Sequence, residues 1–268
     1  MSLQLSLSFG GAACRPEPDP RAAKLQSALT AASRTAFYGR RLKGVSGRQP
    51  GTPGPFETLP ELPAVSLRMY LDNREQFTNA HARPAAARPE GVHLVPNGWR
   101  GKLGFATQAI AGPQADLARL AARIQAGEPA PGRGARRVLV YTKLGEPLLD
   151  PTLRDRLWQA FELPVFEQLH GFDGELLASE CEAHEGMHLE TEAAIFEVLD
   201  GELVVTSLLA LRHPLLRLRT NLAGAIERRA CPCGDTISSF LPVARRKPPA
   251  FVKQVAASAG MAAASTPK

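Results

Sequence analysis

The spacing of apolar residues predicts helices in the first half of the chain. We expect a helix over residues 21–44, because one helical face carries the apolar residues Leu25, Leu29, Ala32 and Ala36. A second helix is expected over residues 65–77, and a third over 113–127, where proline suits the first turn. Residues 78–112 show no clear period. We therefore expect residues 21–135 to form a helical N-terminal region interrupted by linkers.

The pattern changes at Arg136, where short apolar or alternating segments predict strands. The segment "RRVLVYTK" is typical of a buried strand, and Asp150-Pro151 then predicts the start of a helix. Seven further strand-like segments follow up to residue 230, and Asp200-Gly201 predicts a tight hairpin between two of them. We expect residues 136–244 to form a mixed α/β core with antiparallel strands.

The two ends of the chain have a different composition. Residues 1–20 are rich in glycine, serine and proline, and residues 245–268 are basic and then rich in alanine and serine. Neither segment has enough large apolar residues to form a core of its own. Both are therefore expected to be disordered.

Composition and charge bear on location and partners. No apolar run approaches the ~20 residues of a membrane-spanning helix, and the first residues have no basic region that would indicate a signal peptide. With four cysteines in 268 residues, we expect a cytoplasmic protein with reduced thiols and no membrane partner. The net charge is +6, but the basic residues are scattered and only 6% of residues are aromatic. Nucleic-acid binding is therefore not expected.

The segment "ACPCGDT" places Cys231 and Cys233 one residue apart. Together with Cys181 and a histidine, either His184 or His188, they could supply a zinc site with three thiolates and one imidazole. The thiols could also be small buried residues, with the histidine simply hydrogen-bonded in the core. A disulfide within Cys-Pro-Cys would be strained, and a catalytic Cys–His pair would lack a third orienting group.

An acidic segment leads into the Cys181 region. It carries six glutamates between residues 175 and 192. Glu175 or Glu180 could serve as a metal ligand or a general acid. The alternation of apolar and acidic residues along the segment favours a different interpretation, in which these carboxylates face solvent from strands.

Several segments, in one order over about 100 residues, resemble the phenylacetate–CoA ligase branch of the adenylate-forming ligases. These segments are "GEPL" at 145–148, "PVFEQLHGFDGE", "ECEAHEGMHL", "FEVLDGELVVTSL", "HPLLRLRTN" and "CPCGDT". The resemblance implies the α/β distal subdomain of that superfamily. It also implies a zinc site at Cys181, His188, Cys231 and Cys233, with His188 matching the histidine of the family's "GLHL" segment.

The same resemblance implies nucleotide-contacting residues in two turns. Gly145-Glu146-Pro147 matches a turn that lies against the adenine in the family, although it could equally be a plain strand-to-helix turn. His170-Gly171 takes the place of the family's Tyr-Gly. Asp173 and Glu175 flank Gly174, which takes the place of the magnesium-binding glutamate.

Other family features of the adenylation site are changed. The chain has no Ser/Thr/Gly-rich phosphate loop before Gly145, and Asn221-Leu222 replaces the ribose-binding Gly-Asp. The chain ends about 35 residues after Cys233, without the family's lysine-bearing C-terminal domain, so we expect a truncated form.

Two functions remain open on these grounds. The first is a phenylacetate–CoA-ligase-like protein without autonomous adenylation, which keeps a structural zinc site and binds an acyl or aryl carboxylate, a nucleotide or a protein partner. The alternative is an AMP-forming acid–CoA ligase that uses ATP and magnesium with a partner subunit or a non-standard phosphate site.

Overall fold

The structure, a computed structural model, describes residues 19–42, 55–82, 92–95, 108–129 and 134–243. The segments that we expect to be disordered, residues 1–20 and 245–268, lie outside these ranges except for Asp19 and Pro20. Asp19 caps the first helix and Pro20 is its first residue. In the part of the chain that is described, no helix combines the length and the apolar character that a membrane crossing requires.

One half of the sheet is parallel. Its strands are β2 (Val92–Leu94), β3 (Ala109–Pro113), β4 (Arg137–Lys143) and β5 (Val165–His170), which pair in this order. The strand over "RRVLVYTK" is therefore confirmed. β2 and β3 come from the segment without a clear period, where we expected linkers, and they join the sheet of the core. Strands of three and five residues are too short for an alternation to be recognised in the sequence.

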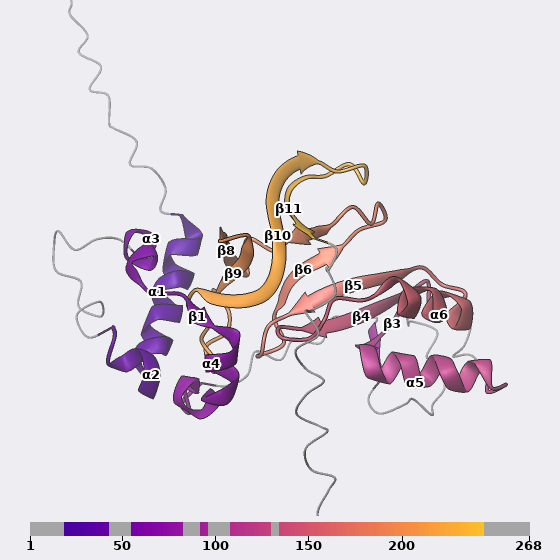
Figure 1. The fold of residues 1–268 in the computed structure, drawn as a ribbon, viewed down its shortest axis with the longest axis horizontal. Coiled ribbons are helices and arrows are strands. Elements are labelled where there is room, and N and C mark those ends of the chain that lie inside the picture. The colour runs from indigo at the N-terminus through magenta and orange to yellow at the C-terminus, as the bar shows by residue number, and fades with distance from the viewer. Residues whose placement is uncertain (1–18, 43–54, 83–91, 96–107, 130–133, 244–268) are drawn as a thin grey trace, which may run out of the picture.

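Helices α5 (Gln114–Gln125) and α6 (Pro151–Phe161) cover one face of the parallel strands (Figure 1). The predicted start of α6 is confirmed: Asp150 Oδ1 accepts a hydrogen bond from the Leu153 amide at 3.0 Å, and Pro151 lies in the first turn. Val138 and Val140 of β4 pack with Leu117 and Leu157 in a buried core between helices and sheet.

The other half of the sheet is antiparallel. After β5 the order is β6 (Leu176–Glu180), β7 (Met187–Leu189), β11 (Thr236–Pro242), β10 (Leu218–Ala230), β9 (Glu202–Ser207) and β8 (Ala194–Leu199). The hairpin at Asp200-Gly201 is confirmed, with positive φ at both residues. β11 was not expected from the sequence.

β10 is one strand of 13 residues, whereas the sequence predicts two shorter ones. Its register to β9 shifts between Arg219 and Ala223, and Asn221 has φ of 60°. Such a bulge interrupts the alternation of side chains without ending the strand. The strand curves across the middle of the molecule (Figure 1), where it pairs with β11 along one part of its length and with β9 along another.

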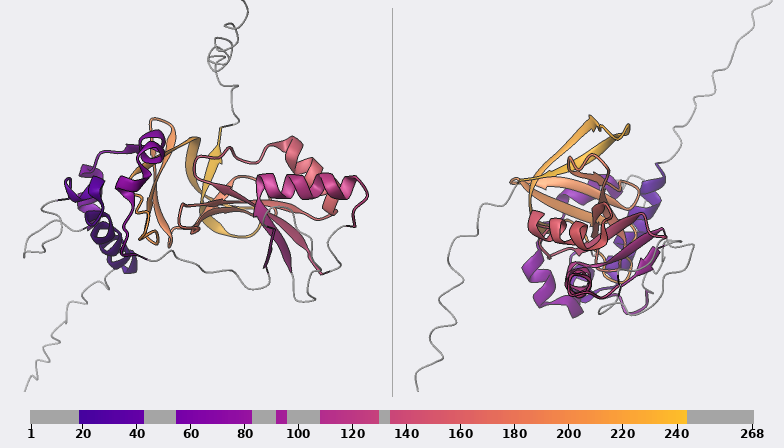
Figure 2. Two further views of the ribbon diagram at one scale, coloured as in Figure 1. Left: turned by 90° about the horizontal axis from the view of Figure 1, so that it is seen from below. Right: turned by 90° about the vertical axis from the view of Figure 1, so that its right-hand side faces the viewer.

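The N-terminal helices pack against the antiparallel end of the sheet (Figure 2). They are α1 (Pro20–Ser33), α2 (Ala36–Gly39), α3 (Pro55–Thr58) and α4 (Leu67–Asp72), with 3-10 turns at Leu59–Glu61 and Arg74–Phe77.

Two of the predicted N-terminal helices are broken in the structure. The helix over 21–44 divides at Thr35, whose hydroxyl accepts a hydrogen bond from the Tyr38 amide and starts α2. The helix over 65–77 begins instead as strand β1 (Val65–Ser66), which pairs with β10. In both places a polar side chain caps the start of a new helix. The spacing of apolar residues, from which we predicted the helices, does not reveal such caps.

Candidate metal centre and ligand crevice

Four strands of the antiparallel half, β6, β7, β10 and β11, bring four metal-ligating side chains together. Cys181 directly follows β6, His188 lies in β7, and Cys231 and Cys233 lie in the turn between β10 and β11. One ligand atom from each of the four lies within 4.8 Å of all the others. Residues 50 positions apart in the chain, Cys181 and Cys231, meet because β7 pairs with both β6 and β11.

The β10–β11 turn presents its two thiols to the group through backbone geometry. The amide of Cys231 donates to the carbonyl of Asp235 at 2.7 Å, and the amide of Gly234 donates to the carbonyl of Cys231 at 2.9 Å. Gly234 has φ of 101°, a conformation that glycine adopts without steric cost. The turn is therefore closed tightly around the Cys-Pro-Cys segment.

The distances suit a tetrahedral ion. The Sγ atoms of Cys181 and Cys231 are 3.5 Å apart, and Cys233 Sγ lies 3.9 Å from His188 Nε2. Thiolates bound to one zinc ion at ordinary bond lengths are about 3.8 Å apart. Cys181, Cys231 and Cys233 are all free thiols. The donor set, three sulfurs and one imidazole nitrogen, is one that zinc prefers.

The electrostatics of the group favour a thiolate at Cys231. The hydrogen bond from the Cys233 amide, and then the contact with His188, lowers the pKa of Cys231 to about 7. A metal binds the deprotonated form of a thiol, so this environment prepares one of the ligands before any ion arrives.

His184, the alternative imidazole, is engaged elsewhere. Its ring stacks on Phe166 with the ring centres 5.2 Å apart, and its Nδ1 lies 3.6 Å from Glu180 Oε2. It is not part of the group of four. The structure thus brings His188, and not His184, to the three cysteines.

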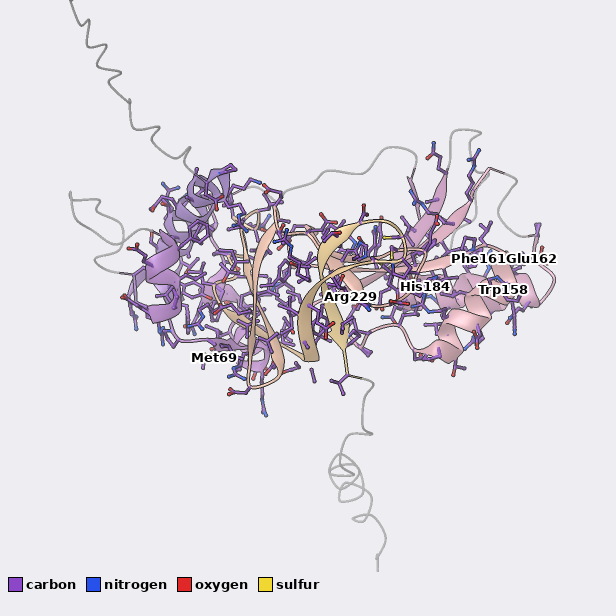
Figure 3. The ribbon with its side chains drawn as sticks, turned by 90° about the horizontal axis from the view of Figure 1, so that it is seen from above. Met69, Trp158, Phe161, Glu162, His184 and Arg229 are labelled. Atoms are coloured by element: carbon purple, nitrogen blue, oxygen red, sulfur yellow. The ribbon has the colours of Figure 1, made fainter. Side chains whose placement is uncertain are left out.

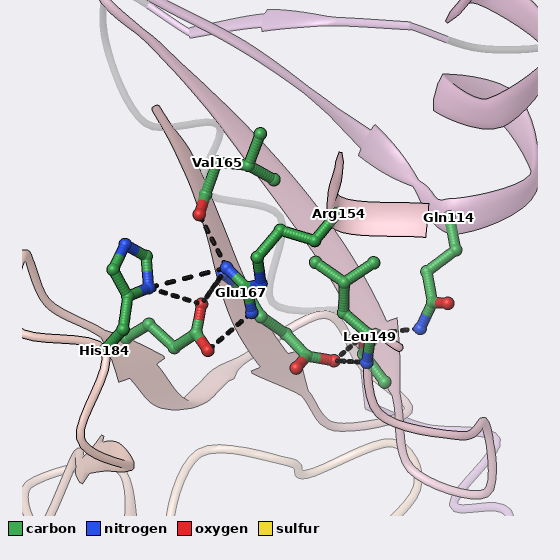
Figure 4. A network of polar contacts seen from close by, with 8 residues as sticks. Gln114, Leu149, Arg154, Val165, Glu167 and His184 are labelled. Atoms are coloured by element: carbon green, nitrogen blue, oxygen red, sulfur yellow. Dashed lines mark hydrogen bonds and ion pairs between the residues drawn. The ribbon is translucent and has the colours of Figure 1, made fainter. Parts of the chain in front are cut away.

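A polar network holds the strand end that carries Cys181 (Figure 4). Arg154 of α6 donates to both carboxylate oxygens of Glu180 and to the carbonyl of Val165. Glu180 Oε2 also accepts from the amide of Glu167 at 2.7 Å. The sequence pattern predicted no role for Arg154 or Glu167, and it favoured a solvent-facing Glu180. Isolated charged residues in a strand or helix give no signal of their partners.

The two turns expected to contact a nucleotide lie side by side. β4 and β5 are parallel neighbours, Lys143 pairs with His170, and the Leu144 amide donates to the His170 carbonyl at 3.0 Å. The Gly145-Glu146-Pro147 turn and the turn after His170 therefore leave the sheet at the same edge. Open α/β sheets bind ligands at the carboxyl ends of their parallel strands, and below we use the word crevice for this edge between the two turns.

The first of these turns is held by its own polar groups. Glu146 Oε2 accepts from the Lys143 amide at 3.0 Å, and the Pro147 carbonyl accepts from Gln114 Nε2 at 2.7 Å. Gly145 has φ of 94° and lies against Leu67 of α4. The turn is a rigid connection between β4 and α6.

Polar atoms of the second turn are buried. His170 Nε2 and Glu175 Oε1 are both buried without a hydrogen-bond partner among the described residues. Burial lowers the pKa of His170 and raises the pKa of Glu175 to about 7. A Cβ atom on Gly171 would lie 2.0 Å from Glu175 Oε1, so only glycine fits there with this carboxyl in place.

Asp173 is committed to the neighbouring loop. Its Oδ2 accepts from the amides of Arg212 and His213, and its Oδ1 lies 2.5 Å from His213 Nδ1. Next to it, Phe172 stacks on Tyr70 with the ring centres 4.8 Å apart. The turn over residues 170–175 is thus a packed corner in which both carboxyl groups face the protein.

The metal group and the crevice lie at opposite ends of β5. Gln168 of β5 pairs with Ser179 of β6, so Cys181 lies beside the first residues of β5, whereas the crevice follows its last residue, His170. Five residues of strand span about 17 Å. A metal ion at the cysteines would therefore be remote from the turns expected to bind a nucleotide.

Comparison with known proteins supports the fold assignment. Solved structures of 2-hydroxyisobutyryl-CoA ligase are similar over 82% of this chain. The open conformation with 2-HIB-AMP and CoA has a TM-score of 0.58 at 15% identity, and the thioesterification state has 0.57 at 16%. The postadenylation state with R3-HIB-AMP has 0.56 at 14%.

The chain spans between 65% and 72% of the length of these ligase structures. No protein-family model matches the sequence, and no curated protein matches it significantly. The chain therefore has the mixed α/β fold found in acyl-CoA ligases of the adenylate-forming superfamily.

Proposed function

We propose that this chain is a protein of the acyl-CoA ligase fold that holds a structural zinc ion and does not adenylate a carboxylate by itself. The observation that carries the proposal is the convergence of Cys181, His188, Cys231 and Cys233 within 4.8 Å, at the end of β5 remote from the crevice. Four protein ligands would fill a tetrahedral shell and leave no open position for a substrate.

The role of the ion would be mechanical. Bound zinc would join the ends of β6 and β10 to β7 through metal–ligand bonds, where the sheet otherwise has only short pairings. β7 has three residues and pairs with β11 through two of them, Met187 and His188. Structural metal sites contribute directly to folding free energy.

The crevice supports binding better than adenylation. Adenylation requires positive groups and a magnesium ion to stabilise charge that develops on the phosphates. Gly174 takes the position of the magnesium-binding glutamate of the resembled family, and Asp173 is bound to the loop at Arg212 and His213. The sequence between residue 60 and Gly145 has no Ser/Thr/Gly-rich phosphate loop.

We therefore propose that the crevice between the two turns binds an acyl or aryl carboxylate or a nucleotide, or that its surface receives a protein partner, without chemistry. The side-by-side arrangement of the turns after β4 and β5 supports this. We also propose a cytoplasmic location, because the zinc ligands must be reduced thiols and that compartment keeps thiols reduced.

Two measurements test the proposal. Elemental analysis of the purified protein should give about one zinc per chain, and a Cys231→Ser/Cys233→Ser variant should bind much less. Less than half an equivalent in the unaltered protein, or an equal content in the variant, would contradict the metal site. ATP–pyrophosphate exchange with a panel of aryl and acyl carboxylates should stay at background, and measurable exchange by the isolated chain would overturn the non-adenylating role.

A second function is favoured by one specific observation. The solved structures that share the fold include a ligase with a bound acyl-adenylate and CoA. On this alternative, the chain is part of an AMP-forming acid–CoA ligase that uses ATP and magnesium, and a partner subunit or a non-standard site supplies the phosphate contacts. Exchange activity that appears only after a co-purifying subunit is added would favour this alternative over the first.

A further inference from the structure

A cavity of about 310 Å³ lies beside the start of α6, and neither the metal group nor the crevice includes it. Its walls come from the loop before α6 and α6 itself, from β5, from the end of β6 through the connection to the start of β7, and from the end of β11. One side is apolar, and is formed by Leu148, Leu149, Met187, Leu241 and Pro242. The other side is polar and includes Glu167. Small-molecule sites commonly combine an apolar wall with a few placed polar groups.

Glu167 is the central polar group of this cavity. The residue is 3% exposed and lies in the middle of β5. Its Oε1 accepts from the Thr142 hydroxyl at 2.5 Å and from the Leu149 amide at 2.7 Å. Its Oε2 has no hydrogen-bond partner among the residues that the structure describes, and Figure 4 shows this oxygen without a contact. One half of a buried carboxyl group is therefore available to the cavity.

The neighbouring charges are already paired with each other. Arg154 binds Glu180 through two hydrogen bonds, and at the rim Arg229 Nη1 lies 3.2 Å from Glu185 Oε2. The charged residues that line the cavity thus leave one carboxylate, that of Glu167, without a compensating cation. A buried carboxylate without a partner is costly, and it is stabilised either by a proton or by a cation.

We propose that this cavity binds a small primary ammonium compound, with the ammonium group on Glu167 Oε2 and the carbon chain against Leu148, Met187 and Leu241. An ammonium group donates hydrogen bonds and carries the single positive charge that the cavity lacks. The apolar wall favours a ligand with an alkyl portion over an inorganic cation.

A metal ion fits this cavity less well than an organic cation. Both oxygens of Glu180 are occupied by Arg154 and the Glu167 amide, so Glu167 and Glu180 together leave one oxygen, Glu167 Oε2, for a ligand. Among the described residues, the grouping that could hold a metal is the Cys/His set, and it does not include Glu167. Divalent cations need several oxygen ligands at once.

The test uses the methyl group of Met187 as a reporter of the cavity. The sequence has four methionines, so a methyl-¹³C spectrum of the full-length protein as purified is simple to assign. Met187 lines the cavity, whereas Met69 is 46% exposed on α4, at a distance from His184 and Arg229 (Figure 3). Titration with n-butylammonium should shift the Met187 signal in a saturable way and leave the Met69 signal unchanged.

Two comparisons decide the origin of that shift. In the unaltered protein, n-butanol and butyrate should bind at least tenfold more weakly than n-butylammonium, because neither supplies the charge. The variant Glu167→Gln should weaken butylammonium binding at least tenfold, whereas Glu182→Gln, an exposed residue that does not line the cavity, should leave it within a factor of two.

The proposal fails if n-butanol binds as tightly as butylammonium, if Glu167→Gln binds it unchanged, or if Met187 shows no saturable response. The comparison of ligands in the unaltered protein decides the question even if Glu167→Gln does not fold. None of these outcomes depends on zinc content or on exchange activity, so the inference is independent of the proposed function.

Discussion

Arg154 and Glu180 form a two-point ion pair one residue before the first thiol of the metal group. Arg154 Nη2 lies 2.7 Å from Glu180 Oε1, and Arg154 Nη1 lies 2.9 Å from Glu180 Oε2. The pair connects α6 in the parallel half of the molecule to the end of β6 in the antiparallel half. It therefore fixes the position from which Cys181 reaches the other ligands.

The first prediction concerns this ion pair. Arg154→Ala should lower the free energy of unfolding by about 2 kcal/mol, because it leaves the largely buried carboxylate of Glu180 without its partner. The loss is smaller than for a fully buried pair because Arg154 is partly exposed to solvent. It should also weaken zinc binding, since Cys181 loses its support. Urea denaturation and competition with a zinc-binding dye measure the two effects. Arg156→Ala on the exposed side of α6 is the matched control and should change neither. Unaltered zinc affinity in Arg154→Ala would argue against the positioning role.

The second prediction concerns pH and Glu175. Burial raises the pKa of this carboxyl group to about 7 in the folded protein, above its ordinary value of 4.5. A group whose pKa is raised by folding contributes its full stability below the unfolded pKa, and the contribution is lost as pH rises through the folded pKa. As the pH rises from 4.5 to 7, ionisation of Glu175 should therefore lower the free energy of unfolding by on the order of 2–3 kcal/mol.

The check is denaturant unfolding of Glu175→Gln and the unaltered protein at pH 5 and pH 8. The glutamine keeps the shape of the side chain but does not ionise. The variant should gain stability relative to the unaltered protein at pH 8 and not at pH 5. An equal difference between the two proteins at both pH values would contradict the assignment.

The third prediction concerns two glycines of one turn. Gly171→Ala should destabilise the fold by about 2–3 kcal/mol, because its Cβ would overlap the buried carboxyl group of Glu175. Gly174→Ala is the matched control: its Cβ would have no atom within 4 Å, and its φ of 88° gives a strain of about 1 kcal/mol. Combining Gly171→Ala with Glu175→Ala should recover part of the loss, which thermal unfolding of the double variant measures. Strictly additive losses would show that the two residues do not collide.

The fourth prediction concerns removal of the metal. Chelation should lower the melting temperature by about 5–10 °C, because the ion would connect the end of β6, the strand β7 and the β10–β11 turn. Cys181→Ser should show the low melting temperature before chelation and little further change after it. Cys14→Ser, which alters the one cysteine outside the described residues, should behave like the unaltered protein. A melting temperature that does not respond to the chelator would contradict a structural ion.

Much of the local structure could be predicted from the sequence. Asp150-Pro151 predicted the start of α6, and Asp200-Gly201 predicted the β8–β9 hairpin, because both signals lie within a few residues of the structure they specify. The breaks at Thr35 and Ser66 were missed, since there a side-chain cap and a strand pairing outweigh the helical period. The alternation of side chains around Asn221 is interrupted by a bulge, so the sequence predicted two short strands where the structure has one long strand.

The candidate sites depended more on the tertiary structure. The sequence by itself determined which residue types could hold a metal, and its resemblance to a ligase family led us to predict two turns that contact a ligand. The residue types alone left His184 and His188 open, and the family resemblance implied His188. The pairing of β7 with both β6 and β11 is what brings His188 to the cysteines. The roles of Arg154 and Glu167 were decided in the same way, because strand pairing and helix packing bring together charged groups from distant parts of the chain. The spacing of apolar and polar residues within one segment carries no information about which other segment packs against it.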